Sequence, residues 1–183
     1  CQRLESYRSD SFYGNDTGGE FWNRGANFYE HNRNKLGITL DLTNPAGMQI
    51  LKELISISDV FAENFTPRAI KNFHLEYEDV RSLNPGIVMV SSTGYGFTGP
   101  WANFGATGPA TEGASGLSYM TGYADGPPEL PEIPYTDYTA GEQTVFAVMT
   151  ALMHRLRSGQ GQFVDISQTQ AASATVPEAL LDF

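Results

Sequence analysis

Apolar residues along the chain fall into short continuous or alternating runs that predict β-strands. Residues 87–90 form an unbroken apolar run, which is typical of a strand buried on both faces, and we predict a strand over 86–91. The same reasoning predicts strands over 59–62 and 161–167. Residues 38–42 alternate between apolar and polar side chains, so they predict one further short strand.

The segments between these runs have helical periodicity. Asn44 and Pro45 are typical of an N-cap and a first helical position, and they predict a helix whose apolar residues recur at helical spacing: Ile50, Leu51, Leu54 and Ile55. The longest predicted helix covers residues 138–157 and has an apolar stripe of Val145, Val148, Met149, Leu152 and Leu156. Shorter helices are predicted at 67–73, 76–83, 109–117 and after residue 167.

Strands that alternate with helices predict a Rossmann-like α/β fold, with a parallel sheet and helices on both faces. Residues 1–31 have no sustained period and predict an irregular N-terminal segment, so the folded domain is expected over 32–183. The 183 residues, 40% of them hydrophobic, are enough for one sizeable core. The chain begins without Met and ends inside a predicted helix, and we expect it to be part of a longer protein.

Composition narrows the classes of partner. The formal net charge is -10 and the basic residues are scattered, so we expect no nucleic-acid or membrane partner. No apolar run approaches the roughly 18 residues of a membrane span, and no leader begins the chain. The single cysteine, Cys1, excludes an internal disulfide and fits a cytoplasmic protein. His31, His74 and His154 lack metal-ligand spacing, so we expect no metal site.

Asp137 is the most informative polar residue, because it lies where a proline-rich segment meets the longest predicted helix. Two interpretations are open. An aspartate in front of a helix is commonly its N-cap and satisfies a free backbone N–H group. A carboxylate facing the positive end of a helix also stays ionised at neutral pH, which suits a carboxylate nucleophile.

Two predicted loops follow strands and are candidate walls of one pocket, because ligands of open α/β sheets bind at the carboxyl ends of the strands. In the first loop, Asn64 offers a donor and an acceptor and Phe65 offers a flat apolar face, which suits adenine or a pantetheine chain. The alternative is a turn asparagine followed by a core phenylalanine. The second loop, residues 94–100, is rich in glycine but lacks the Lys-Ser/Thr ending of a P-loop and the full dinucleotide fingerprint, so an NTPase or NAD enzyme is disfavoured.

A series of short segments resembles, in the same order, the class III CoA-transferases, which include formyl-CoA transferase and the carnitine and benzylsuccinate CoA-transferases and have the 2-methylacyl-CoA racemases as relatives. The matching segments are residues 32–42, 63–67, 83–88, 94–100 and 121–128, Asp137, and residues 159–165. The resemblance implies that this chain is part of the large domain of an interlocked homodimer. It also implies CoA and acyl-CoA as substrates, a small carboxylic acid as acceptor, and no permanently bound cofactor.

The resemblance also implies roles for individual residues. Asp137 occupies the place of the family's nucleophile, which forms an aspartyl anhydride with the donor acyl group and then an aspartyl-CoA thioester. Leu40, Asn64 and Phe65 fall where the family contacts CoA. Lys71 stands near the place of a basic residue that meets a CoA phosphate, or is solvated surface.

Departures from the family pattern limit the substrate. Residues 105–108 are small and uncharged, which predicts a roomier acyl pocket than one for formyl or oxalyl groups. The racemases use a histidine in this region, and no histidine occurs between His74 and His154, so racemisation is disfavoured. A third possibility is a truncated module of the same fold without activity.

Overall fold

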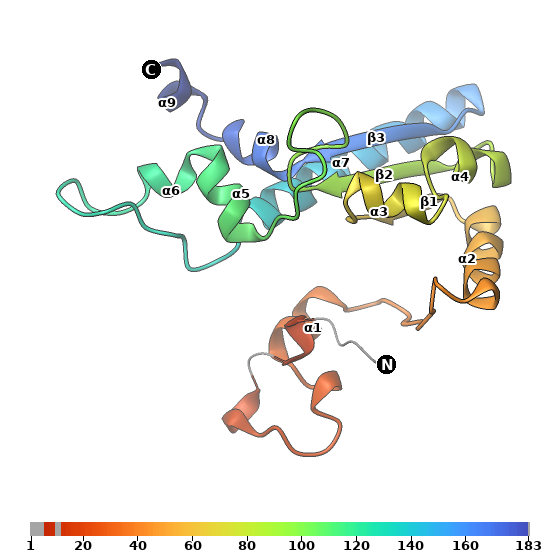
Figure 1. Cartoon of the computed structure of the whole chain (residues 1–183), viewed down its shortest axis with the longest axis horizontal. Helices are drawn as coiled ribbons and strands as arrows, with labels where there is room; N and C mark the ends of the chain where they lie inside the picture. The colour runs from red at the N-terminus through yellow and green to blue at the C-terminus, as the bar shows by residue number, and fades with distance from the viewer. Residues whose placement is uncertain (1–5, 10–11, 183) are drawn as a thin grey trace. The chain divides into compact units, whose positions relative to one another are not determined.

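A computed structural model describes residues 6–9 and 12–182, and the chain divides into two compact units, Cys1–Asn44 and Pro45–Phe183 (Figure 1). Cys1 lies outside the described residues. The described part of the first unit contains short helical turns, which are η1 (Ser6–Ser9), η2 (Tyr13–Asn15), η3 (Phe21–Asn23) and α1 (Ala26–His31). Arg8 connects three of them, since its guanidinium in η1 donates to the Trp22 carbonyl of η3 at 3.0 Å and stacks 3.7 Å from the centre of the Phe28 ring of α1.

The strand predicted over residues 38–42 is wrong. This segment runs without regular secondary structure and then turns at Leu42 and Thr43. Asp41 forms the turn, because its carboxylate accepts the Thr43 N–H at 3.0 Å and the Thr43 hydroxyl at 2.7 Å. Apolar alternation alone does not make a strand, which also needs a hydrogen-bonded neighbour, and this segment pairs with none of the strands in the described residues.

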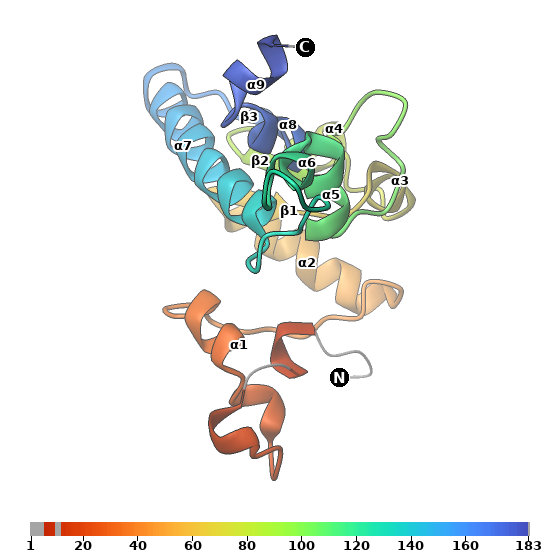
Figure 2. The same cartoon turned by 90° about the vertical axis from the view of Figure 1, so that its left-hand side faces the viewer.

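The second unit is built on a parallel sheet, as predicted. Its strands are β1 (Val60–Glu63), β2 (Val88–Thr93) and β3 (Gln162–Ser167), in the order β1-β2-β3. The helices are α2 (Pro45–Ile57), α3 (Pro67–Asn72), α4 (Tyr77–Leu83), α5 (Gly108–Ser115), α6 (Leu117–Met120), α7 (Tyr135–Ser158), α8 (Gln168–Ser173) and α9 (Pro177–Leu181). Helices α3 and α4 lie on one face of the sheet and α7 on the other, which confirms the predicted α/β architecture (Figures 1 and 2).

The main core lies between the sheet and α2, α3 and α4. Strand residues Phe61, Met89 and Phe163 are partners in register and share this face. The fully buried members of the cluster are Ile55, Ile70, Leu75, Val80, Ile87 and Met89. The predicted stripe of α2 is therefore only half correct, since Ile55 is buried while Ile50 and Leu54 are 43% and 37% exposed.

Helix α7 packs on the sheet with small side chains. Ala140 and Ala151 are buried, whereas Val145, Met149 and Leu156 of the predicted apolar stripe are 64%, 58% and 77% exposed. The predicted stripe therefore includes residues that are mostly exposed, and the buried residues of α7 have small side chains. Small side chains let the helix backbone approach the strands closely, and periodicity alone does not tell which of two apolar stripes faces inward.

The turn after α7 depends on glycines. The helix ends at Ser158, and the next residue, Gly159, has a left-handed φ of 73° and closes the last turn through a hydrogen bond from its N–H to the Arg155 carbonyl. The Gly161 N–H donates to the Pro85 carbonyl at 3.3 Å. A Cβ atom on Gly161 would overlap the carbonyl oxygen of Ile87, so the entry into β3 needs a residue without a side chain.

Candidate functional site

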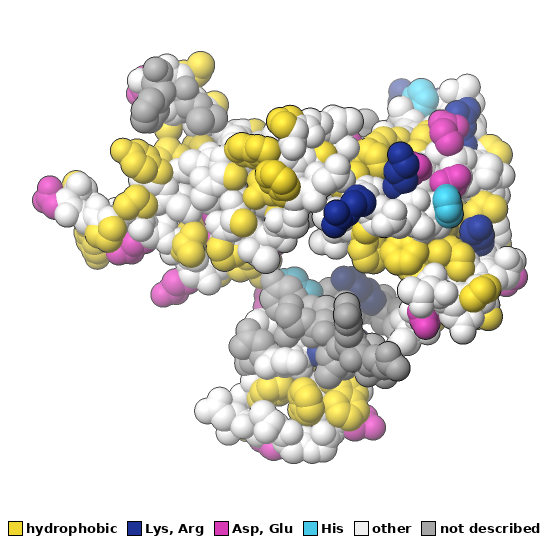
Figure 3. All heavy atoms as spheres, in the orientation of Figure 1, with side chains coloured by type: hydrophobic (Ala, Val, Ile, Leu, Met, Phe, Trp, Pro, Cys, Tyr) yellow, Lys and Arg dark blue, Asp and Glu magenta, His cyan; other side chains and the backbone are white. Residues whose placement is uncertain are grey.

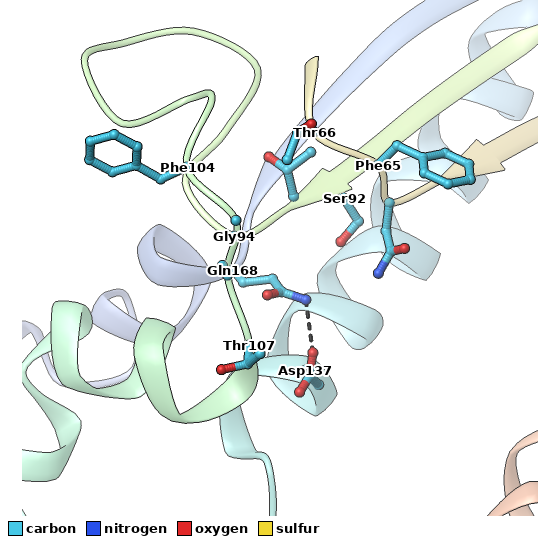
Figure 4. A pocket seen from close by; sticks show the side chains of 12 residues that line it. Phe65, Thr66, Ser92, Gly94, Phe104, Thr107, Asp137 and Gln168 are labelled. Carbon is cyan, nitrogen blue, oxygen red and sulfur yellow. Dashed lines mark hydrogen bonds between the residues drawn. The ribbon is translucent and has the colours of Figure 1, made fainter. Parts of the chain in front are cut away.

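A pocket of about 180 Å³ opens at the carboxyl ends of the strands. It is lined by residues 64–66 after β1, residues 92–94 at the end of β2, residues 104–107 before α5, and the side chains of Asp137 and Gln168. Figure 4 shows Phe65 and Phe104 flanking it on opposite sides. This is where the strands of an open α/β sheet place their ligands.

Three of the predicted site residues meet in this pocket. Asn64, Phe65 and Asp137 all line it, although they come from the loop after β1 and from the start of α7. Lys71 is exposed in the last turn of α3 and is not among the lining residues. Leu40 belongs to the first unit.

The N-cap interpretation of Asp137 is wrong. Helix α7 begins at Tyr135 rather than at Tyr138, so Asp137 lies inside the first turn and Pro134 occupies the N-cap position. The Asp137 backbone N–H donates to the Pro134 carbonyl at 3.0 Å, and the cap position makes no side-chain hydrogen bond. The Asp137 carboxylate is therefore not needed to close its own helix.

Gln168 holds the Asp137 carboxylate. Its amide Nε2 donates to Asp137 Oδ1 at 2.9 Å from the first residue of α8, directly after β3 (Figure 4). Burial raises the pKa of Asp137, and the Gln168 hydrogen bond opposes this shift. Oδ2 accepts no hydrogen bond from the described residues and faces Gly108, where an added Cβ would lie 2.9 Å from it.

Sequence reasoning missed Gln168. The signal that could have found it is its place at the end of a predicted strand, the same kind of position that pointed to Asn64. The chain also contains no arrangement in which the described His, Cys, Asp and Glu residues could jointly hold a metal ion.

Two carboxylates support the loops that form the pocket. Glu63 Oε2 accepts the Phe65 N–H at 2.7 Å, and Asp165 accepts the Phe97 N–H at 2.9 and 3.1 Å. Glu63 and Asp165 are both in register with Ser91 of the central strand. Burial of Glu63 raises its pKa and the negative charge of Asp165 adds to the shift, while the Phe65 N–H opposes it.

This environment predicts a pH-dependent stability. Because the folded-state pKa of Glu63 is raised, the buried charge lowers the free energy of unfolding at neutral pH. This loss of stability decreases as the pH falls through the raised pKa of Glu63 toward the ordinary value of 4.5, because the side chain becomes protonated and neutral. We expect Glu63→Gln to be more stable than the wild type at pH 7, with a difference that shrinks toward pH 5.

Urea unfolding at a series of pH values measures this difference. Glu53→Gln, at an exposed position of α2, is the control and should follow the wild type at each pH. A Glu63→Gln variant that is less stable than the wild type at pH 7 would contradict the predicted cost of the buried charge.

The surface has no single charged field on the face seen in Figure 3, where basic side chains stand among acidic and neutral ones. Within the described ranges, 6–9 and 12–182, no helix has both the length and the apolar character needed to cross a membrane.

Comparison with known families explains this arrangement. The sequence model of CoA-transferase family III matches residues 4–183. The chain belongs to this family. The prediction from the motif series is confirmed.

Curated relatives of this chain are named as CoA-transferases. The chain is 35% identical to succinyl-CoA:glutarate CoA-transferase of Mus musculus, 34% identical to succinate–glutarate CoA-transferase of Agrobacterium fabrum, and 34% identical to succinyl-CoA–D-citramalate CoA-transferase of Chloroflexus aurantiacus. These matches cover 85%, 86% and 82% of the chain. The chain spans only 36%, 40% and 38% of the length of these relatives.

Solved structures agree with the family assignment. A CAIB/BAIF family protein from Brucella suis superposes with a TM-score of 0.82 at 30% identity, over 87% of this chain and 42% of that one. A hypothetical protein from Mycobacterium tuberculosis superposes with a TM-score of 0.81 at 26% identity, over 87% of this chain and 45% of that one. The fold of the second unit is therefore that of this family.

Proposed function

We propose that the protein transfers CoA from an acyl-CoA donor to a carboxylic acid acceptor, with Asp137 as the nucleophile. The observation that carries the proposal is that Asp137 is the one ionisable side chain among the pocket-lining residues. Half-buried, it has a single side-chain donor on Oδ1, which leaves Oδ2 to attack an electrophilic carbon.

The reaction proceeds through three covalent states of Asp137. Asp137 Oδ2 attacks the thioester carbon of the donor, the C–S bond breaks, and an aspartyl acyl anhydride and CoA thiolate form. The thiolate attacks the aspartyl carbonyl carbon, which releases the donor acid and leaves an aspartyl-CoA thioester. The acceptor carboxylate attacks this thioester to form a second anhydride, and the thiolate then takes the acceptor acyl group and regenerates Asp137.

A carboxylate suits this role because an anhydride and a thioester both keep the carbonyl carbon activated throughout the cycle. No proton transfer is required, since each step exchanges one anion for another. The half-buried position of Asp137 limits the access of water, which would otherwise hydrolyse the intermediates.

The pocket walls support a place for the CoA chain. We propose that Asn64 and Phe65 contact CoA, because both line the pocket beside Asp137. Leu40 and Lys71 stay predictions from the family resemblance. The named acids of the relatives, glutarate and D-citramalate, make dicarboxylic acids the first acceptors to test.

Chemical trapping tests the proposal. The complete protein is incubated with succinyl-CoA and treated with borohydride, which reduces an aspartyl thioester to an alcohol. Mass spectrometry is expected to find the reduced side chain at Asp137. A label at another side chain, or none during measurable turnover, would overturn the assignment.

The racemase and the inactive module are separate outcomes with their own measurements. No histidine is among the pocket-lining residues, so racemisation has no second base there. Loss of optical activity from a chiral 2-methylacyl-CoA without an acceptor acid would favour the racemase. Failure of the isolated chain to bind CoA in calorimetry would favour the truncated, inactive module. The resemblance also implies a homodimer, which light scattering of the complete protein tests. Cell fractionation tests the expected cytoplasmic location.

A further inference from the structure

Glu112 is a buried acid outside the pocket lining. It lies in α5 with only 1% of its surface exposed. Its Oε1 accepts the backbone N–H of Tyr135 at 2.8 Å. Tyr135 is the first residue of α7, so this acid from another helix contacts the turn that carries Asp137.

This contact brings a side-chain acceptor to a helix start whose N-cap residue makes no side-chain hydrogen bond. The first N–H groups of a helix have no partner within the helix, and a polar side chain at the N-cap usually accepts one of them. Pro134 occupies that position in α7 and has no side-chain acceptor. The Tyr135 N–H donates to the Ile133 carbonyl at 2.8 Å and also to Glu112, so Glu112 adds a side-chain acceptor from another helix to the start of α7.

A second tie joins the same two helices. Thr111 Oγ1 and Thr136 Oγ1 are 2.6 Å apart and both residues are fully buried. Thr111 also donates to the Gly108 carbonyl at 2.9 Å. The two residues before Asp137 are thus each tied to α5.

The start of α5 also forms the wall beside the carboxylate, since the space next to Asp137 Oδ2 is the place where a Gly108 side chain would stand. Any shift of the first turn of α7 against α5 would therefore change the position of Oδ2 in the pocket. Because the packing here is tight, even a small displacement of the first turn of α7 would move the Asp137 carboxylate away from its reactive position.

We infer that Glu112 is a positioning residue, which fixes the first turn of α7 and thereby the aim of the Asp137 carboxylate. This inference rests on the proposed function, because it gives Asp137 a reacting atom to place. Glu112 acts through the Tyr135 N–H and does not touch the substrate. The wall formed by Asn64 and Phe65 is supported separately by Glu63.

Substitution of Glu112 tests the inference through the division between kcat and KM. In the complete protein, Glu112→Ala is expected to lower kcat about 10- to 100-fold, the usual effect of a nucleophile displaced by about 1 Å. The KM for the acyl-CoA should stay within about 3-fold, because Glu112 does not touch the substrate and its loss should change the free energy of binding by less than the roughly 1.4 kcal/mol of a tenfold effect. Glu112→Gln keeps an oxygen acceptor of similar size and should recover most of kcat. Glu142→Ala, at an exposed position of α7, is the matched control and should behave as the wild type.

Two results would overturn the inference: a wild-type kcat in Glu112→Ala, or a Glu112→Gln variant no better than Glu112→Ala. Activities are compared per folded molecule, measured by circular dichroism. If Glu112→Ala does not fold, Glu112→Asp decides by the same criterion, because its carboxyl is one methylene shorter and falls short of the Tyr135 N–H.

Trapping with borohydride separates this inference from the proposed function. If Asp137 is not the nucleophile, the wild type itself gives no reduced Asp137. If Asp137 is the nucleophile and Glu112 places it, the wild type is labelled and Glu112→Ala is labelled more slowly in a single turnover. Equal labelling rates in the two proteins would overturn the role of Glu112 and leave the proposed function intact.

Discussion

Asp137→Ala is expected to abolish CoA transfer in the complete protein, with kcat lowered on the order of 10⁴-fold or more, as for the loss of other covalent nucleophiles. The pocket lining offers no other ionisable side chain to replace the lost carboxylate. The fold should survive, because Asp137 does not cap its helix and its own burial raises its pKa. The free energy of unfolding should change by no more than about 1 kcal/mol. Steady-state turnover of succinyl-CoA with glutarate and urea unfolding measure the two effects.

Two further variants make this result specific. Asp137→Asn keeps the size of the side chain and an oxygen that can accept from Gln168, yet it removes the nucleophilic carboxylate, so it should be as inactive as Asp137→Ala. Asp125→Asn, at an exposed loop position, should retain full activity. Turnover retained in both Asp137 variants would end the nucleophile assignment.

Gly161→Ala is expected to lower the free energy of unfolding by about 3 kcal/mol, the upper end of the usual cost of overpacking. An added Cβ would overlap the Ile87 carbonyl oxygen and lie 2.8 Å from the carbonyl carbon of Gly86. These are backbone atoms beside the central strand, so they cannot rotate out of the way as a side-chain end would. Relief of the overlap would move β3 away from the Ile87 side of the sheet, and urea unfolding measures the cost.

The matched control is Gly141→Ala in α7. A Cβ on Gly141 has no atom within 4 Å, and alanine is favoured over glycine inside a helix by about 0.5–1 kcal/mol. This variant should therefore be more stable than the wild type. If Gly161→Ala were as stable as Gly141→Ala, the close approach of Gly161 to the Ile87 backbone would not contribute to the free energy of unfolding.

The missed assignments in this protein have local causes that can be named. Asp137 has the sequence context of an N-cap, since a proline-rich segment precedes it and a helix follows. Pro134 has no polar side chain to mark the true start at Tyr135, and the side-chain acceptor for the Tyr135 N–H is Glu112 in another helix. The residues that neighbour Asp137 in the sequence do not indicate the contact between Glu112 and Tyr135.

The two apolar stripes of α7 show a similar limit. Large side chains such as Met149 and Leu156 have the spacing of a buried face, but the sheet packs against Ala140 and Ala151. Hydrophobicity ranks the large residues first, whereas close packing of a helix on strands favours the small ones.

The sequence by itself determined the sheet strands that become β1, β2 and β3, the parallel α/β fold and the residues Asn64, Phe65 and Asp137 of the pocket. These follow from apolar runs and helix signals over a few residues, from the rule that places ligands at strand ends, and from a family resemblance spread over the chain. Only the tertiary structure decided the start of α7, the unpaired state of residues 38–42, and the contacts of Asp137 with Gln168 and of Tyr135 with Glu112. The physical reason is that these features depend on hydrogen bonds between residues far apart in the sequence. Such bonds form only when the folded backbone brings the two groups within hydrogen-bond distance, so no pattern of neighbouring residues predicts them.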